Sequence, residues 1–132
     1  MLAKSIAIID DEADIINLFK EALQMDGFKV HAFADPIEAF NHIQKRPMEY
    51  AVILSDLKMP VMNGNELCTK LMNLNPELKI ILMSAYENIE YDTSKFTFIQ
   101  KPMSIARLLK IVKESLNEQK NNTKFRAKEY LP

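Results

Sequence analysis

The chain is poor in cysteine and glycine, and each shortage excludes a class of protein. One cysteine among 132 residues, Cys68, excludes an internal disulfide framework and fits a reducing compartment. With one cysteine and two well-separated histidines, a tetrahedral zinc site is not expected. The only glycines are Gly27 and Gly64, so the chain has neither a glycine-rich phosphate loop nor a dinucleotide fingerprint.

Long apolar runs and a strong charge bias are also missing. The longest apolar runs have the length of a strand, so we expect no signal peptide and no membrane span. A formal net charge of -1 indicates neither a general nucleic-acid surface nor a membrane patch. The apolar fraction of 48% is typical of a globular protein with a real core. We therefore expect a soluble, cytoplasmic protein.

Short apolar runs alternate along the chain with amphipathic stretches. The apolar runs predict strands at residues 6–9, 29–33, 51–54, 80–83 and 96–99, the second of them more polar and at a sheet edge. Helices are predicted over 14–25 (Ile15, Leu18, Phe19, Ala22 and Leu23 have helical spacing), from Asp35-Pro36 onward, over 67–74 and from about 104 to about 118. Alternating strands and helices predict an α/β fold with a parallel sheet covered on both faces.

Residues 1–118 are expected to form one domain. Apolar periodicity is lost over 119–132, which we interpret as a C-terminal helix extension or a flexible tail. This segment contains Lys120, Lys124, Arg126 and Lys128. Such a mild basic bias is more typical of a solvated tail than of a nucleic-acid arm, so we expect no nucleic-acid binding by the chain itself.

Polar residues follow the predicted strands at the points where the strands end. Asp10 and Asp11 follow the first strand, Asp56 the third, Ser84 the fourth and Lys101 the fifth. Ligands of open parallel α/β sheets bind outside the carboxyl ends of the strands, so we expect these side chains at one rim. Taken singly, each has a plainer explanation, such as helix capping by the aspartates or a solvated loop lysine.

Three carboxylates at one rim would repel one another, and a hard divalent cation would resolve the conflict. Mg2+ prefers carboxylate and water oxygens. One carboxylate could then attack phosphorus and form an aspartyl phosphate. A lysine ammonium and the metal would neutralise the transferring oxygens, and a serine hydroxyl could donate a hydrogen bond to them.

Four segments together resemble the receiver domains of two-component response regulators. They are Ile8–Glu12, Ile53–Gly64, Met83–Ala85 and Phe98–Pro102. The Asp-x-x-Met-Pro-x-Met-x-Gly pattern and the Lys-Pro pair are specific together, and the resemblance covers about residues 4–118. It implies that 1–118 is a receiver domain with a flavodoxin-like, doubly wound five-stranded parallel sheet of order 2-1-3-4-5.

The resemblance implies roles for the acidic positions. Asp56 would be the phosphoacceptor, and Asp11 would ligate Mg2+ directly with Asp10 helping. Asp56 and the backbone carbonyl of Lys58 would supply further oxygens to the metal.

Other positions would read out or tune the phosphorylated state. Lys101 would pair with the phosphoryl group, Ser84 would swing toward it, and Phe98 would follow inward as the switch aromatic. Phe98 also has a simpler interpretation as a core aromatic. Lys58 and Tyr86 occupy positions that tune phosphate lifetime in this family, and their bulk predicts slow hydrolysis unless both side chains point to solvent.

One feature departs from the family pattern. Only eleven residues separate Ser84 from Phe96, and residues 86–95 have no clear apolar stripe. A parallel crossover usually needs about a dozen residues or more. We therefore predict that the fourth helix of the family is shortened or missing here, which puts partner docking through that face in doubt.

The resemblance implies a signalling switch and not an ordinary enzyme. A histidine kinase or a histidine phosphotransfer protein would phosphorylate Asp56 with Mg2+, and a separate, unidentified protein would respond. Two alternatives stay open: a phosphorelay intermediate that passes the group onward, and a pseudo-receiver that is not phosphorylated. A dehalogenase-type phosphatase is disfavoured because the aspartates are adjacent and the chain has no room for a cap domain.

Overall fold

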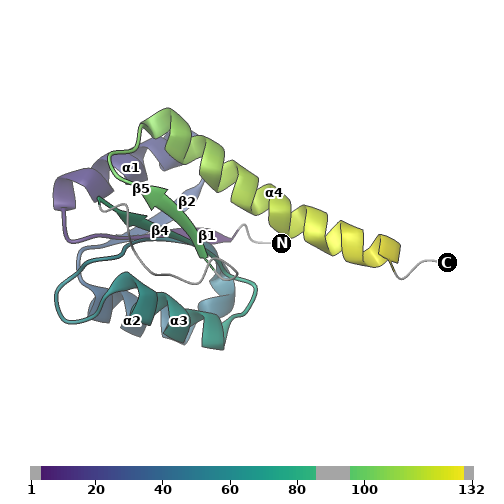
Figure 1. The fold of residues 1–132 in the computed structure, drawn as a ribbon, viewed down its shortest axis with the longest axis horizontal. Helices are drawn as coiled ribbons and strands as arrows, with labels where there is room; N and C mark the ends of the chain where they lie inside the picture. The colour runs from purple at the N-terminus through teal and green to yellow at the C-terminus, as the bar shows by residue number, and fades with distance from the viewer. Residues whose placement is uncertain (1–3, 86–95, 130–132) are drawn as a thin grey trace.

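A five-stranded parallel sheet lies between two layers of helices in the computed structural model, which describes residues 4–85 and 96–129 (Figure 1). The strand order is β2-β1-β3-β4-β5. The strands are β1 (Ser5–Ile9), β2 (Lys29–Phe33), β3 (Tyr50–Asp56), β4 (Lys79–Ser84) and β5 (Phe96–Gln100). Every neighbouring pair is parallel. The predicted fold class, order and edge position of the second strand are confirmed.

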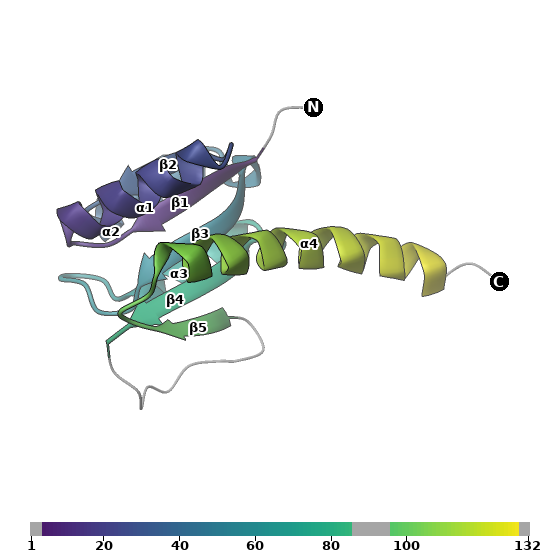
Figure 2. The same cartoon turned by 90° about the horizontal axis from the view of Figure 1, so that it is seen from above.

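Within the described residues, two helices cover each face of the sheet. The described residues contain α1 (Ala13–Met25), α2 (Pro36–Lys45), α3 (Gly64–Leu74), α4 (Ile105–Glu129) and a 3-10 turn, η1 (Pro47–Glu49). Helices α1 and α4 lie on one face, and α2 and α3 lie on the other (Figures 1 and 2). No helix in these parts of the chain is both long and apolar enough to cross a membrane.

The central strand β3 packs against both layers, which explains its uninterrupted apolar run. All seven of its residues are buried. Successive side chains of a strand point to opposite faces, so Ile53 joins the α2–α3 core while Val52 and Leu54 join the α1–α4 core. Burial on both faces therefore holds the carboxyl end of β3, where Asp56 lies, in a rigid position.

Helix ends follow the local sequence signals. The Asp35 carboxylate accepts a hydrogen bond from the Ile37 N–H at 3.0 Å, and Pro36 occupies the first helical turn of α2. After α1, Gly27 takes a φ of 92°, a left-handed conformation that suits glycine.

Two helices differ in detail from the pattern that the sequence indicated. Of the five α1 residues with helical spacing, Phe19 and Leu23 are buried, but Leu18 is 50% exposed and Ile16, outside that set, is buried. Helix α4 continues to Glu129 and extends past the sheet in Figure 2, so residues 119–129 form the helix extension that was one of the two alternatives for this segment. The predicted loss of the fourth helix concerns 86–95, which lies outside the described residues, and the division at residue 118 stays a prediction.

Candidate functional site

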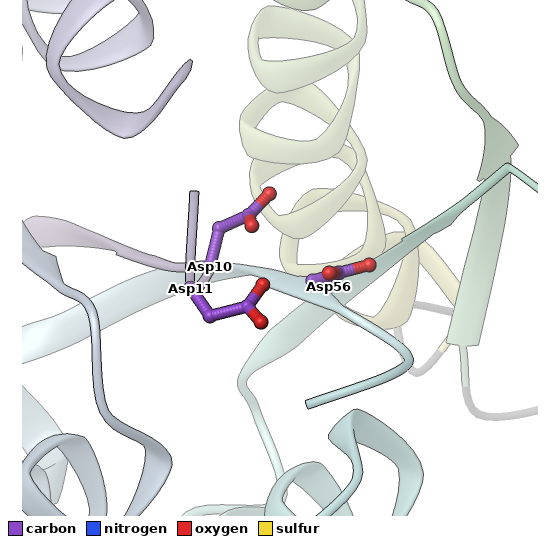
Figure 3. Close-up of side chains that lie close together, drawn as sticks. All are labelled: Asp10, Asp11 and Asp56. Carbon is purple, nitrogen blue, oxygen red and sulfur yellow. The ribbon is translucent and has the colours of Figure 1, made fainter. Parts of the chain in front are cut away.

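Three carboxylates meet at the carboxyl edge of the sheet (Figure 3). Asp10 and Asp11 directly follow β1, and Asp56 is the last residue of the adjacent strand β3. One carboxylate oxygen from each lies within 4.8 Å of the others. Asp10 is completely buried and Asp56 is 8% exposed, whereas Asp11 is exposed. The expected meeting of these acidic side chains is observed.

The pleat of the sheet explains why side chains from three strands converge. Three residues of the α1–α4 core each lie two positions before one of these polar side chains. They are Ile8 before Asp10, Leu54 before Asp56, and Ile99 before Lys101. Because side chains alternate along extended backbone, this spacing directs all three toward the same face. Asp56 therefore clusters with Asp10, which lies 46 positions before it in the sequence, and with Lys101, which lies 45 positions after it.

The Lys101 ammonium lies among the carboxylates. Its Nζ is 2.8 Å from Asp10 Oδ2 and 3.5 Å from Asp56 Oδ1, and the side chain is only 15% exposed. The Lys101 N–H also donates to the Ser84 carbonyl at 2.7 Å, which attaches the end of β5 to the end of β4. The simpler interpretation of Lys101 as a solvated loop lysine is therefore wrong.

Asp10 supports the start of α1 as well as the acidic cluster. Its Oδ1 accepts a hydrogen bond from the Glu12 N–H at 3.0 Å, and its own N–H donates to the Phe33 carbonyl at 3.1 Å. The capping interpretation thus holds in part. The second oxygen of Asp10 remains with Lys101, so one buried side chain serves both purposes.

The protonation of the cluster reflects burial and like charge. Burial, together with the charges of Asp10 and Asp11, raises the pKa of Asp56 from 3.8 to about 6, against the opposing effect of Lys101. Burial alone would lower the pKa of Lys101, but its hydrogen bond to Asp10 and the surrounding carboxylates raise it overall. Lys101 is therefore charged at neutral pH, and Asp56, although its pKa is raised to about 6, is still mostly a carboxylate there.

Gly64 allows α3 to begin directly against Asp56. A Cβ at Gly64 would overlap the carbonyl oxygen of Asp56 and would lie 3.1 Å from both its carbonyl carbon and Leu57 Cα. The Gly64 N–H donates to the Leu57 carbonyl at 2.8 Å. The sequence analysis used Gly64 only as part of the family pattern and missed its role in positioning α3. The scarcity of glycine in the chain was the available signal.

The predicted switch residues lie on β4 and β5, the two strands that follow β3 in the sheet. Ser84 is buried at the end of β4, and Phe98 of β5 is half-buried against the α2–α3 core. Leu82, two residues before Ser84, also belongs to the α2–α3 core, and side chains two positions apart in a strand point to the same face. Ser84 and Phe98 therefore share a face of the sheet. The Lys58 side chain is exposed in the loop after β3. Tyr86 lies outside the described residues.

The donor set fits a hard divalent cation. Carboxylate oxygens are the ligands that Mg2+ prefers, and three of them converge here with one on the solvent side. Two of the three are buried beside a single ammonium, so like charges are left partly uncompensated. Asp10, Asp11 and Asp56 would hold such an ion.

Comparison with known proteins gives a consistent family. Residues 6–113 match the family described as the response regulator receiver domain. A CheY-like response regulator receiver domain protein from Methanospirillum hungatei JF-1 has a similar structure, with a TM-score of 0.84, 30% identity, and coverage of 92% of this chain and 99% of that chain.

Two curated relatives differ greatly in length. Sensor kinase CckA of Brucella abortus (strain 2308) is 32% identical over 121 residues, which are 87% of this chain and 13% of that protein. Sporulation initiation phosphotransferase F of Bacillus subtilis (strain 168) is 25% identical over 126 residues, which are 92% of this chain and 100% of that protein. The chain thus spans about an eighth of one relative and the whole of the other.

Proposed function

The chain belongs to the response regulator receiver family, and on that basis we propose that it is a phosphorylation-dependent switch that accepts a phosphoryl group on Asp56. Receiver domains are signalling modules and not classical enzymes, and the acidic triad is typical of their Mg2+ site. The observation that carries the proposal is the contact of one lysine ammonium with two buried carboxylates from different strands.

The transfer step follows from the positions of these groups. A carboxylate oxygen of Asp56 attacks phosphorus and forms a P–O bond. The P–N bond to the donor imidazole breaks, and the leaving nitrogen keeps the electron pair and, once protonated, becomes neutral histidine. Lys101 balances the charge on the phosphoryl oxygens. Mg2+, held by Asp10, Asp11, Asp56 and the Lys58 carbonyl, supplies further charge neutralisation when bound.

The switch arises from a competition for Lys101. In the unphosphorylated protein its ammonium is bound to Asp10 and lies near Asp56. A phosphoryl group on Asp56 offers stronger acceptors, so Lys101 moves toward it and Ser84 turns to donate a hydrogen bond. Phe98 lies on the same face as Ser84, and its ring moves inward into the space that the Ser84 side chain leaves when it turns. The change reaches the surface at β4 and β5.

Receiver domains partner histidine kinases or histidine phosphotransfer proteins, and we propose one of these as the donor. The protein that responds to the phosphorylated form is unidentified. Receiver domains are typically cytoplasmic, and we propose the same location for this protein.

A phosphorelay role is the second candidate. The observation that favours it is the likeness to a sporulation phosphotransferase over that protein's full length. A relay intermediate would return its phosphoryl group to the histidine of a phosphotransfer domain, whereas a terminal switch would lose it to water. Incubating the phosphorylated chain with such a domain, and following label on each protein, separates the two roles.

Labelling with acetyl phosphate tests the proposed function. We expect one phosphoryl group per chain in the presence of Mg2+, mapped to Asp56 by borohydride trapping of the acyl phosphate. Removing Mg2+ with EDTA should slow labelling strongly, because the acidic cluster then repels the donor. Label mapped to another residue, or unaffected by EDTA, would show that the site works differently.

Phosphate lifetime provides a separate prediction about Lys58. We expect Lys58→Ala to speed phosphate loss by about fivefold, equivalent to roughly 1 kcal/mol of barrier. The Lys58 side chain is exposed in this structure, so the effect requires that it fold over the acyl phosphate once Asp56 is phosphorylated and impede the attacking water. Lys45→Ala, which removes an exposed charge at the far end of α2, is the matched control. Equal decay in both variants would exclude this role for Lys58.

A further inference from the structure

Glu12 is a third carboxylate neighbour of the Lys101 ammonium. Its Oε1 lies 3.9 Å from Lys101 Nζ, on a side chain that is 59% exposed. The other two neighbours, Asp10 and Asp56, have side chains that are 0% and 11% exposed. The ammonium is thus enclosed by carboxylates on its protein side and faces Glu12 on its solvent side.

The backbone at Glu12 is held in place, so its side chain starts from a defined point at the rim of the site. The Glu12 N–H donates to Asp10 Oδ1, and the Glu12 carbonyl accepts from the Ile15 and Ile16 N–H groups at 3.1 and 3.2 Å. Glu12 is the N-cap residue of α1, where short polar residues are favoured, yet its side chain makes no capping hydrogen bond. Helix capping therefore does not explain a glutamate here.

We propose that Glu12 is a positioning and specificity-determining residue that makes the site discriminate among phosphodonors by their charge. The proposal rests on the function proposed above for Asp56. Glu12 attracts the Lys101 ammonium toward solvent and places a negative charge where a donor must enter. Both effects oppose a small anionic donor, and the opposition grows with the charge on that donor.

A protein donor can overcome this opposition in a way that a small anion cannot. A phosphohistidine arrives with an interface that supplies its own binding free energy and can bring a cation or hydrogen-bond donor against an exposed carboxylate. Glu12 would then pair with the partner, and Lys101 would be released toward the phosphoryl group. The residue would thereby favour protein donors over free metabolite phosphates.

Two small donors of different charge test the inference. At neutral pH acetyl phosphate is doubly negative and phosphoramidate is singly negative, and each transfers a phosphoryl group without a protein interface. With saturating Mg2+ and label mapped to Asp56, we expect Glu12→Gln to raise the second-order rate constant about twofold for phosphoramidate and about fourfold for acetyl phosphate, since the repulsion scales with donor charge. Both gains should nearly vanish at 1 M salt, where screening is strong.

Asp14→Asn is the matched control, because it removes the same charge from an exposed residue in the first turn of α1. Its rate constants should be close to those of the parent for both donors. Equal gains for the two donors with Glu12→Gln, no gain, or the same gains with Asp14→Asn would each overturn the inference. If the parent carries no label on Asp56, the proposed function itself fails, so the two failures are distinguishable.

Discussion

Replacing Asp56 with asparagine is expected to stabilise the metal-free protein at neutral pH while ending its phosphorylation. The pKa of Asp56 is raised from 3.8 to about 6 by burial and by Asp10 and Asp11. The ionised carboxylate therefore lowers the stability of the folded state by up to roughly 3 kcal/mol, and asparagine, which has nearly the same shape but no charge, avoids this loss. The substitution also removes the nucleophilic oxygen, so label from acetyl phosphate at position 56 should disappear.

The sign of the pH dependence follows from a folded-state pKa above the unfolded one. Below about pH 3.8 the carboxyl is protonated in both states, and the variant should gain little. Between pH 3.8 and about 6 the unfolded chain ionises first, so the parent loses stability relative to the variant as the pH rises. Above about pH 6 the difference should be constant at its largest value.

Urea unfolding in EDTA from pH 4 to pH 8 measures this difference, with Asp14→Asn as the control for removing an exposed charge. The control should change stability by less than about 0.5 kcal/mol. Saturating Mg2+ should stabilise the parent by about 2.7 kcal/mol at a concentration of 100 times Kd, and so reduce or reverse the advantage of the variant. A variant that is less stable than the parent at pH 7 without metal would contradict the arrangement of charges described here.

Replacing Gly64 with alanine is expected to damage both the fold and the site. The added Cβ would overlap the Asp56 carbonyl oxygen, and its other close neighbours are also backbone atoms that no rotamer change can move. The same carbonyl oxygen accepts a hydrogen bond from Ser55 Oγ at 2.9 Å, which further restricts its movement. We expect a loss of stability on the order of 3 kcal/mol.

Phosphoryl transfer should suffer in the part of the population that stays folded. The start of α3 or the end of β3 must shift, and a displacement of about 1 Å at a reacting group can cost on the order of 100-fold in rate. The measurement is the rate of Asp56 labelling at a temperature where circular dichroism shows the variant to be folded.

Gly27→Ala is the matched control for this substitution. Gly27 has a φ of 92° and no atom within 4 Å of an added Cβ, so alanine there brings backbone strain without a clash. It should cost about 1 kcal/mol and leave the labelling rate unchanged. If the two alanine variants were equally stable and equally active, the close approach of α3 to Asp56 would not be what requires glycine.

Much of the architecture could be predicted because local patterns report it. The apolar runs predicted all five strands, and the Asp35-Pro36 pair predicted the start of α2. Periodicity was less informative about which side of a helix is buried. The spacing that includes Leu18 correctly predicted α1, yet Ile16 is buried and Leu18 is half exposed, because the orientation of a helix depends on the sheet beneath it.

Local reasoning left the end of α4 open, because it allowed either a helix extension or a flexible tail after residue 118. Apolar periodicity is lost after residue 118, but the helix continues to Glu129. Loss of apolar periodicity means that the sequence no longer marks a buried face, but it does not mark the end of the helix itself. A helix is usually ended by a helix-breaking residue, and residues 119–129 contain neither proline nor glycine.

Sequence alone determined which residues follow or end the strands. Because the carboxyl ends of parallel strands share an edge, it also determined that one group of polar side chains would lie together, namely Asp10, Asp11, Asp56 and Lys101. Tertiary structure decided how those charges are divided. Lys101 binds Asp10 more closely than Asp56, Glu12 stands on its solvent side, and Gly64 lies against the Asp56 backbone. These distances depend on strand register and on the packing of α1 and α3, which join residues distant in sequence, so no local pattern contains them.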